Sequence, residues 1–228
     1  MRKPMVNLAK AEGGGGDDIP ALVDMVWDAF RGPGESLFPH TARGRAWLER
    51  SFEGFLGRPS FYRPESRIAV VRSPNGRPVA FLLAHIVRPG QNAGGKSWKT
   101  RWERCGDGDG DGDGDDKGDA GVSEERLAAF FEPMARAHQL VLKGKEGHVF
   151  IELLITKPSH RLRGHASALV GWAARLADEL GYPCYLDGGG GGGRGSRICE
   201  RAGFRAQDVE FRYGGPPPCV PMLRPGRE

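Results

Sequence analysis

The sequence predicts an α/β fold built on a mixed sheet, and two patterns carry that prediction. Residues 148–156 are nearly all apolar, 166–180 have apolar side chains at helical spacing, and 183–187 form a short β-rich run. A strand, a helix and a strand at these lengths imply a parallel crossover. Two further β-rich runs, 67–72 and 78–87, flank an Asn-Gly pair, which is a strong signal for an antiparallel hairpin.

The N-terminal half is expected to add two helices. Asp18 is a suitable N-cap, Pro20 lies just inside the helix start, and apolar residues then recur at helical spacing as far as Phe30. A second helix is expected around 45–55, where apolar residues recur in the same way.

The C-terminal half is expected to add two more helices and a strand around the long helix at 166–180. Ser123 begins a capping-like sequence ahead of a third helix. Gly181 suits the left-handed position that follows the long helix. A short helix over 196–202 and a strand over 207–213 complete the predicted fold.

The chain divides into one domain with a segment on either side. Residues 1–17 are expected to form a flexible arm, because ordering their run of glycines would cost entropy. The domain covers 18–213. Within it, an Asp/Gly-rich insertion at about 88–122 is expected to be disordered, because it has few apolar groups and no period. Residues 214–228 are Pro-rich and are expected to form an extended tail.

Charge is spread unevenly over the 228 residues, whose formal net charge is +4. Residues 107–119 hold seven Asp and one Lys, a local charge of −6, which leaves +10 on the rest (4 + 6). A basic body suits an anionic ligand such as a nucleotide-bearing cofactor. It would also suit nucleic acid, but no zinc finger, aromatic RNA-binding signature or basic stripe is present, so no nucleic-acid partner is expected.

The cysteines and the start of the chain indicate the compartment. The four cysteines show neither a C-x-x-C pair nor zinc-ligand spacing, so no metal site is predicted. The first ten residues lack the apolar region of a secretory signal, and no apolar run is long enough to span a bilayer. We therefore expect a cytoplasmic protein without a membrane partner. A homodimer is left open.

The turn at 161–166 has the features of an anion site. It joins the buried strand to the long helix, so backbone N–H groups at the helix start lack partners within the helix and the helix dipole adds partial positive charge. Gly164 and Ala166 are small enough for a diphosphate to approach the backbone, and Arg161 and Arg163 add positive charge. The alternative is a helix start with a permissive glycine.

The strand, turn and helix together resemble the GNAT superfamily of N-acetyltransferases. The family pattern, Arg/Gln-x-x-Gly-x-Gly/Ala after an apolar strand and a proline, is met by Arg161, Gly164 and Ala166, with Pro158 before them. The sequence CERAGF at 199–204 resembles the family's Y-E-K-L-G-F signature, and DDIPALVDMVWDAF resembles its first helix. The sequence FFEPMARAHQ is similar to the fungal small-molecule branch.

The resemblance implies a twisted, splayed sheet with helices on both faces and acetyl-CoA as cosubstrate. The diphosphate would lie on the turn and the pantetheine arm on the end of the strand, at Leu154, Ile155, Thr156, Arg161, Leu162, Arg163, Gly164, His165, Ala166 and Ser167. An amine, expected to be that of a small molecule, would attack the thioester directly. The alternatives are a protein Lys or N-terminal acetyltransferase and a non-catalytic acyl-CoA-binding domain.

Such a reaction needs a base for the ammonium proton and an acid for the leaving thiolate. Glu152 is the best candidate base, because it lies in an apolar strand where burial would raise its pKa. The alternative is a strand-face residue paired with an Arg or with a backbone group. His148 shares its strand face by two-residue alternation, and His85 is a weaker candidate. Cys199 stands where many relatives have a tyrosine acid, which puts the acid role in doubt.

Two other patterns are discounted. Gly188, Gly190 and Gly193 satisfy G-x-G-x-x-G after a strand, but a run of six glycines matches any glycine pattern. The Asp-Gly run from Asp113 partly matches a calcium loop, but Lys117 occupies a ligand position.

Overall fold

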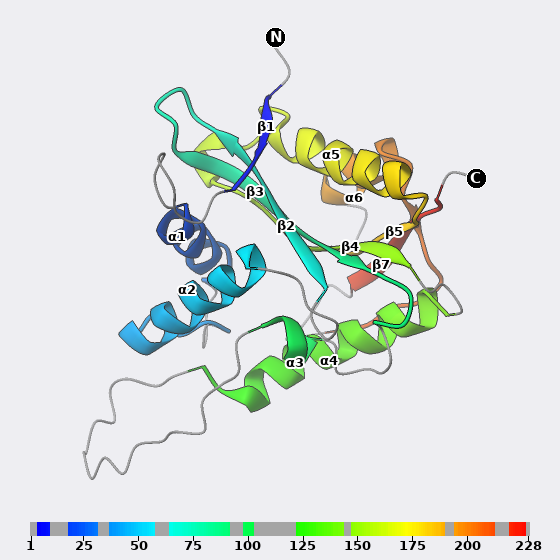
Figure 1. Cartoon of the computed structure of the whole chain (residues 1–228), viewed down its shortest axis with the longest axis horizontal. Helices are drawn as coiled ribbons and strands as arrows, with labels where there is room; N and C mark the ends of the chain where they lie inside the picture. Colours follow the sequence, from blue (N-terminus) through cyan, green and yellow to red (C-terminus); the bar gives the residue numbers. More distant parts are fainter. Residues whose placement is uncertain are drawn as a thin grey trace.

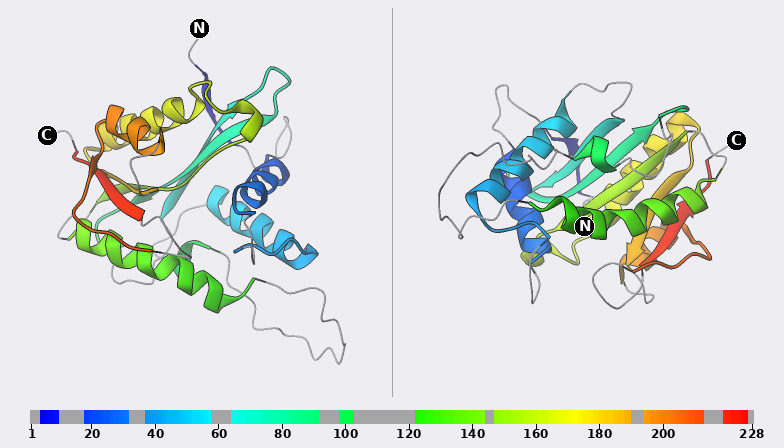
Figure 2. Two further views of the ribbon diagram at one scale, coloured as in Figure 1. Left: turned by 180° about the vertical axis from the view of Figure 1, so that it is seen from behind. Right: turned by 90° about the horizontal axis from the view of Figure 1, so that it is seen from below.

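A seven-stranded mixed sheet separates two layers of helices (Figure 1 and Figure 2). The computed structural model describes residues 4–9, 18–31, 37–57, 64–91, 98–102, 122–143, 147–189, 194–212 and 219–226. The strands are β1 (Val6–Leu8), β2 (Glu65–Arg72), β3 (Pro78–Val87), β4 (His148–Thr156), β5 (Cys184–Gly189), β6 (Arg205–Ala206) and β7 (Cys219–Arg224). Their order is β1-β2-β3-β4-β5-β7-β6, and of these neighbours only β4 and β5 run parallel.

The helices cover both faces of the sheet, as the sequence predicts. They are α1 (Ile19–Ala29), α2 (Ala42–Leu56), α3 (Trp98–Arg101), α4 (Glu124–Val141), α5 (His165–Leu180) and α6 (Arg194–Arg201). In Figure 2 the sheet lies between α5 with α6 on one side and α1, α2 and α4 on the other. Alternate strand residues therefore pack into two cores. Phe81 and Leu83 face α1, α2 and α4, and Leu82 faces α5.

The hairpin and the ends of two helices match their sequence signals, and a third helix begins at a cap that was not predicted. Strands β2 and β3 pair across a turn in which Gly76 has a φ of 82°. The side chain of Thr41 caps α2 by accepting from Gly44 N at 3.0 Å, and that of Ser123 caps α4. Gly181 ends α5 with a φ of 66°, a conformation that glycine adopts without strain.

Asp18 is the N-cap residue of α1, as predicted, but its side chain makes no cap hydrogen bond. Its carboxylate instead accepts from both Nη atoms of Arg72, at 2.7 and 2.6 Å. Asp18 is buried, and a charged carboxylate out of water requires a strong partner more than a backbone amide does. The contact fastens the start of α1 to the end of β2.

Both flanking segments contribute strands, which departs from the predicted arm and tail. Within 1–17, β1 pairs with the outer edge of β2, and Ala9 N donates to Ile68 O at 2.8 Å. Within 214–228, β7 pairs with β5, and Arg224 holds Asp178 of α5 through two contacts of 2.6 and 2.9 Å. The strand predicted over 207–213 is wrong for its described residues, which form only an isolated bridge at Phe211, whereas the short strand β6 lies just before them at Arg205–Ala206. These pairings depend on open sheet edges, which local sequence does not reveal.

The predicted insertion at 88–122 contains an ordered part. Residues 98–101 form α3, and Trp102 is only 2% exposed, stacked on Trp47 with ring centroids 5.5 Å apart and an interplanar angle of 3°. Trp102 also meets Phe55 edge-to-face at 5.0 Å. Disorder is therefore the wrong prediction for 98–102, because these aromatic contacts bury enough apolar area to order the segment. The calcium-like run and glycines 190–193 lie outside the described residues.

The parallel strands β4 and β5 separate, as the resemblance implies. They pair only over Val149–Ile151 and Cys184–Leu186, after which β5 continues against β7. The β5-facing edge of β4 is therefore open from Glu152 onward. Glu152 is also the extra residue of a β-bulge, since Leu83 faces Leu153 while Ala84 faces Ile151. A bulge re-aims side chains, and such irregularities are common next to active sites.

Candidate active site

A groove runs from the N-terminus of α5 to the open end of β4. Its volume is about 970 Å³, and α1 and α6 complete its walls. All the residues predicted to bind the cofactor line this groove except Arg163. Its walls come from segments far apart in the sequence, and its volume suits a long, thin ligand.

The turn before α5 has the backbone shape that the glycine pattern predicts. Leu162 and Gly164 both have left-handed φ values, of 63° and 81°, and a Cβ built on Gly164 would have no protein atom within 4 Å. Gly164 is the N-cap of α5 and supplies no side-chain cap. The first N–H groups of α5 therefore point into the groove without an intrahelical partner.

Positive charge surrounds this helix start. Arg161 lines the groove from the turn, and Arg197 and Arg201, one turn apart on α6, line it from the other side. His165 lies at the first position of α5, and burial lowers its pKa, so it is neutral at pH 7. Its Nδ1 is buried without a hydrogen-bond partner among the described residues. The two α6 arginines were missed from sequence, although their i, i+4 spacing on a short basic helix was a usable signal.

Arg163 does not line the groove. Its Nη2 donates to Ser159 O at 3.1 Å, across the turn. The side chain therefore stabilises the turn rather than pointing into the groove.

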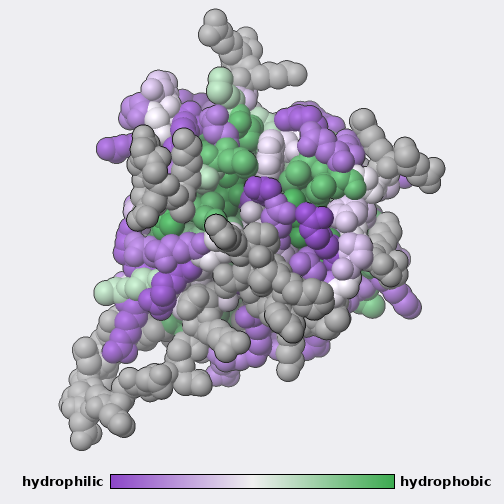
Figure 3. Space-filling view, viewed as in Figure 1, coloured by the Kyte–Doolittle hydropathy of each residue, from purple (hydrophilic) through white to green (hydrophobic). Residues whose placement is uncertain are grey.

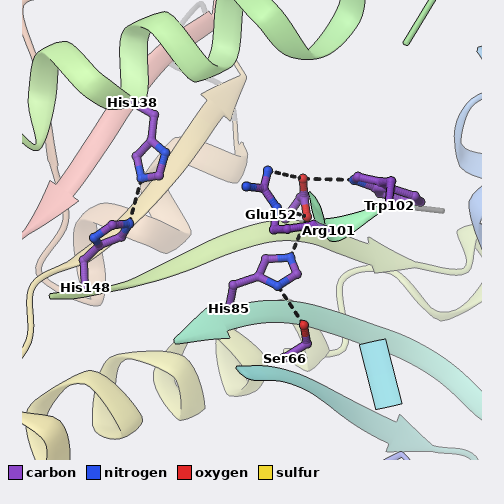
Figure 4. A network of polar contacts seen from close by, with 7 residues as sticks. All are labelled: Ser66, His85, Arg101, Trp102, His138, His148 and Glu152. Atoms are coloured by element: carbon purple, nitrogen blue, oxygen red, sulfur yellow. Dashed lines mark hydrogen bonds and ion pairs between the residues drawn. The ribbon is translucent and has the colours of Figure 1, made fainter. Parts of the chain in front are cut away.

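Glu152 is the centre of a buried network on the other face of β4 (Figure 4). Its Oε1 accepts from Arg101 Nη2 at 2.8 Å and from Trp102 Nε1 at 3.1 Å. Its Oε2 lies 2.5 Å from His85 Nε2. Arg101, the last residue of α3, and Trp102, which follows it, were both missed from sequence because they were assigned to the disordered insertion.

The pKa of Glu152 shifts in the direction opposite to the sequence prediction. Burial alone raises it, but the charge of Arg101 and the contacts with His85 more than offset that, so the pKa falls well below its usual range. Glu152 is thus a stable carboxylate paired with an Arg, which was the alternative interpretation. A carboxylate with so low a pKa is a weak proton acceptor near neutral pH.

The two candidate histidines, His85 and His148, are both buried and neutral. Burial lowers the pKa of His85, and because a carboxylate only accepts, its Nε2 carries the proton to Glu152 while Nδ1 accepts from Ser66 Oγ at 2.9 Å. Burial lowers the pKa of His148 to about 4. His148 and Glu152 share a strand face, as predicted, but His148 contacts His138 of α4, with 3.0 Å between their Nε2 atoms.

Cys199 faces the core rather than the groove. It is 5% exposed and packs between α6 and the sheet, while its neighbours Arg197 and Ile198 line the groove. Burial raises the pKa of its thiol to about 11. Its side chain therefore lies among core residues and away from the groove lining.

Two other kinds of functional feature are absent from the described part of the chain. None of its helices is long and apolar enough to cross a membrane, and none of its His, Cys, Asp and Glu residues gather in threes around a possible metal position. The described surface on the face of Figure 1 is largely hydrophilic, with apolar side chains gathered in its upper half (Figure 3).

No protein-family model and no curated protein matches the sequence, whereas solved structures match the fold. A Corynebacterium glutamicum protein described as histone acetyltransferase HPA2 and related acetyltransferase aligns with a TM-score of 0.58 at 20% identity, covering 100% of this chain and 98% of that one. Mosquito arylalkylamine N-acetyltransferase like 5b gives 0.56 at 12% identity, covering 96% and 98%.

A third structure shows the same likeness with a bound cosubstrate. It is a GNAT superfamily phosphinothricin acetyltransferase from Sinorhizobium meliloti in complex with AcCoA, with a TM-score of 0.55 at 14% identity, covering 99% of this chain and 89% of that one. The likeness extends over the sheet and both helix layers, and the fold that the sequence predicts is confirmed: this chain has the fold of the GNAT superfamily acetyltransferases.

Proposed function

We propose that the protein transfers an acetyl or other short acyl group from acyl-CoA to the amine of a small molecule. The observation that carries this proposal is the groove. It joins an uncapped helix start, ringed by arginines, to an open strand edge beside the separation of β4 and β5. A diphosphate attached to a long amide-bearing arm has the shape and chemistry to fill it.

The groove residues fit acetyl-CoA from its diphosphate to its thioester. The amides of His165, Ala166 and Ser167 would hold the diphosphate, with charge from Arg197 and Arg201. The arm's amides would pair with the open backbone edge from Thr156 back towards Glu152. Four residues of strand span about 13 Å, so the thioester would arrive where the strands part.

The chain's contribution to the reaction is positioning. The amine nitrogen attacks the thioester carbon, the C–N bond forms, and the C–S bond breaks with its electron pair on sulfur. Holding both reactants in line supplies much of the rate enhancement.

The names of the structural neighbours suggest the acceptors to test. They mention an arylalkylamine, phosphinothricin and a histone acetyltransferase. A panel of tryptamine, phosphinothricin and a lysine-bearing peptide therefore separates small amines from protein substrates. We expect free-thiol release with a small amine and a smaller rate with the peptide.

Cofactor binding is tested by thermal shift with CoA. A ligand at 100 times its Kd stabilises the native state by about 2.7 kcal/mol, so the Tm should rise by several degrees. Gly164→Val should abolish the shift by filling the space that the diphosphate needs. Gly171→Ala on the same helix is the control, because its added Cβ would make only an ordinary 3.7 Å contact with Arg175.

A second variant guards against a folding defect in Gly164→Val, whose φ of 81° disfavours valine. Replacing Arg197 and Arg201 together by Ala leaves the backbone unstrained and should weaken CoA binding at least tenfold by calorimetry. Equal CoA affinity in the wild type and in both variants would refute the groove as the cofactor site.

A further inference from the structure

A second acid lies where β4 and β5 separate, on the face of the sheet beneath α4. The last parallel pair joins Ile151 to Leu186, so Glu152 and Asp187 are the first residues beyond it on β4 and β5. The two acids share a small cavity, whose other lining residues are Arg101, Phe131, Met134, Ala135, His138 and Phe150. The thioester of the proposed cofactor would arrive at this same point.

The two carboxylates differ in how far their hydrogen-bonding capacity is used. Glu152 accepts from Arg101, Trp102 and His85. Asp187 accepts from Tyr185 OH through Oδ1 at 2.6 Å, while its Oδ2 is buried without a hydrogen-bond partner in the described part of the chain. A buried, unsatisfied carboxylate oxygen in a native fold calls for an explanation, and one explanation is a ligand proton.

Their electrostatic surroundings shift the pKa values of the two acids in opposite directions. Burial is the main cause that raises the pKa of Asp187 to about 7, and the charge of Glu152 adds to it, while Tyr185 and Arg101 oppose it. His138 of α4 also lines the cavity and is neutral, because burial lowers its pKa. Two acids whose surroundings push their pKa values apart take different roles in a reaction.

We propose that Asp187, rather than Glu152, accepts the proton of the acceptor amine. This inference rests on the proposed function. The amine enters as an ammonium ion, and Asp187 Oδ2 takes one of its protons. The freed electron pair forms the C–N bond, the C–S bond breaks, and the second nitrogen proton goes to the CoA thiolate. The first proton then leaves Asp187 for water, which completes the balance.

Glu152 is then a positioning residue. With Arg101 and Trp102 it ties α3 to the bulge of β4, and its negative charge stabilises the protonated form of Asp187. An acceptor with a pKa close to the working pH is the efficient one in general-base catalysis. Asp187 meets that condition and Glu152 does not.

The test compares wild type, Asp187→Asn and Tyr185→Phe, with acetyl-CoA saturating and the amine panel above, from pH 5.5 to 9. The wild-type kcat should fall tenfold per pH unit below about pH 7, as Asp187 becomes protonated. Asp187→Asn should lower kcat by roughly 10²–10⁴-fold and remove this pH dependence. Its CoA-induced Tm shift should match the wild type, which shows that the fold and the cofactor site are intact.

Tyr185→Phe provides an independent check, because it keeps the carboxylate and removes the hydrogen bond that favours its ionised form. Its kcat profile should have the same shape with the fall displaced to higher pH. Asp24→Asn, an exposed acid on α1, is the control and should keep the wild-type profile.

The outcomes separate this inference from the proposed function. If wild type releases no thiol with any amine while CoA still raises its Tm, the proposed function fails and this inference fails with it. If wild type is active but Asp187→Asn keeps its kcat and pH dependence, or Tyr185→Phe leaves the fall in place, only the role of Asp187 is overturned.

Discussion

Glu152→Gln should destabilise the protein severely, because it removes a buried carboxylate that lies 2.8 Å from the Arg101 guanidinium. The two side chains are 1% and 6% exposed, so water cannot replace the lost charge. Removing one partner of a buried ion pair costs about 3–5 kcal/mol. Domains have about 5–15 kcal/mol of total stability, so the variant should lie close to the folding threshold.

The pH dependence of this effect has a defined sign. Arg101 and His85 hold the pKa of Glu152 below its unfolded value, so its stabilisation is full above the unfolded pKa and is lost as pH falls through the folded pKa. The difference in unfolding free energy between wild type and Glu152→Gln should therefore be largest at neutral pH and shrink in acid.

Urea unfolding followed by circular dichroism measures both quantities. Asp24→Asn is the matched control, because it breaks an ion pair of 2.9 Å whose side chains are 33% and 57% exposed and should cost about 0–1 kcal/mol. Arg101→Met and the double variant complete a cycle in which the double variant loses less than the sum of the singles. If the unfolding free energy of Glu152→Gln lies within about 1 kcal/mol of the wild-type value, the reasoning is refuted.

Three further outcomes are expected. Trp102→Ala should lower the unfolding free energy by about 3–5 kcal/mol, measured in urea. Deleting 107–119 should leave the urea midpoint nearly unchanged. Equal losses of stability would contradict the assignment of Trp102 to the core. Acid should lower the unfolding free energy, because the pKa of His148 is about 4 in the folded protein and the unfolded chain therefore binds the extra proton below about pH 6.5. This single group should cost about 2 kcal/mol at pH 5. An unfolding free energy that stays constant between pH 7 and 5 would argue against it. Cys199→Ser should leave kcat within a few fold, since its side chain is buried in the core; a loss like that of Asp187→Asn would restore the thiol as the acid.

The resemblance to the fungal small-molecule branch and the homodimer both stay predictions. Neither depends on the groove, so the cofactor and base experiments do not test them. The acceptor panel bears on the first, and sedimentation would decide the second.

The sequence by itself determined the elements whose signals are local. An apolar run made β4, a 3.6-residue period made α5, Asn-Gly made the β2–β3 hairpin, and Gly164 made the left-handed cap. Because the turn and the helix start are adjacent in the chain, most of the lining of the groove proposed for the cofactor could be predicted from one segment. Its residues are set by hydrogen-bonding rules that act within a few positions.

Tertiary structure alone decided everything that depends on distant partners. The edges of β2 and β5 recruited β1 and β7 from segments that have no strand pattern of their own. The ionisation of two acids was settled in the same way. Both are buried, yet Arg101 from a segment some fifty positions away lowers the pKa of Glu152. Asp187, whose one hydrogen bond among the described residues comes from Tyr185, has its pKa raised by burial. Burial and charge pairing act through space, so the sequence could name an acid in an apolar strand but could not say which acid would be ready to take a proton.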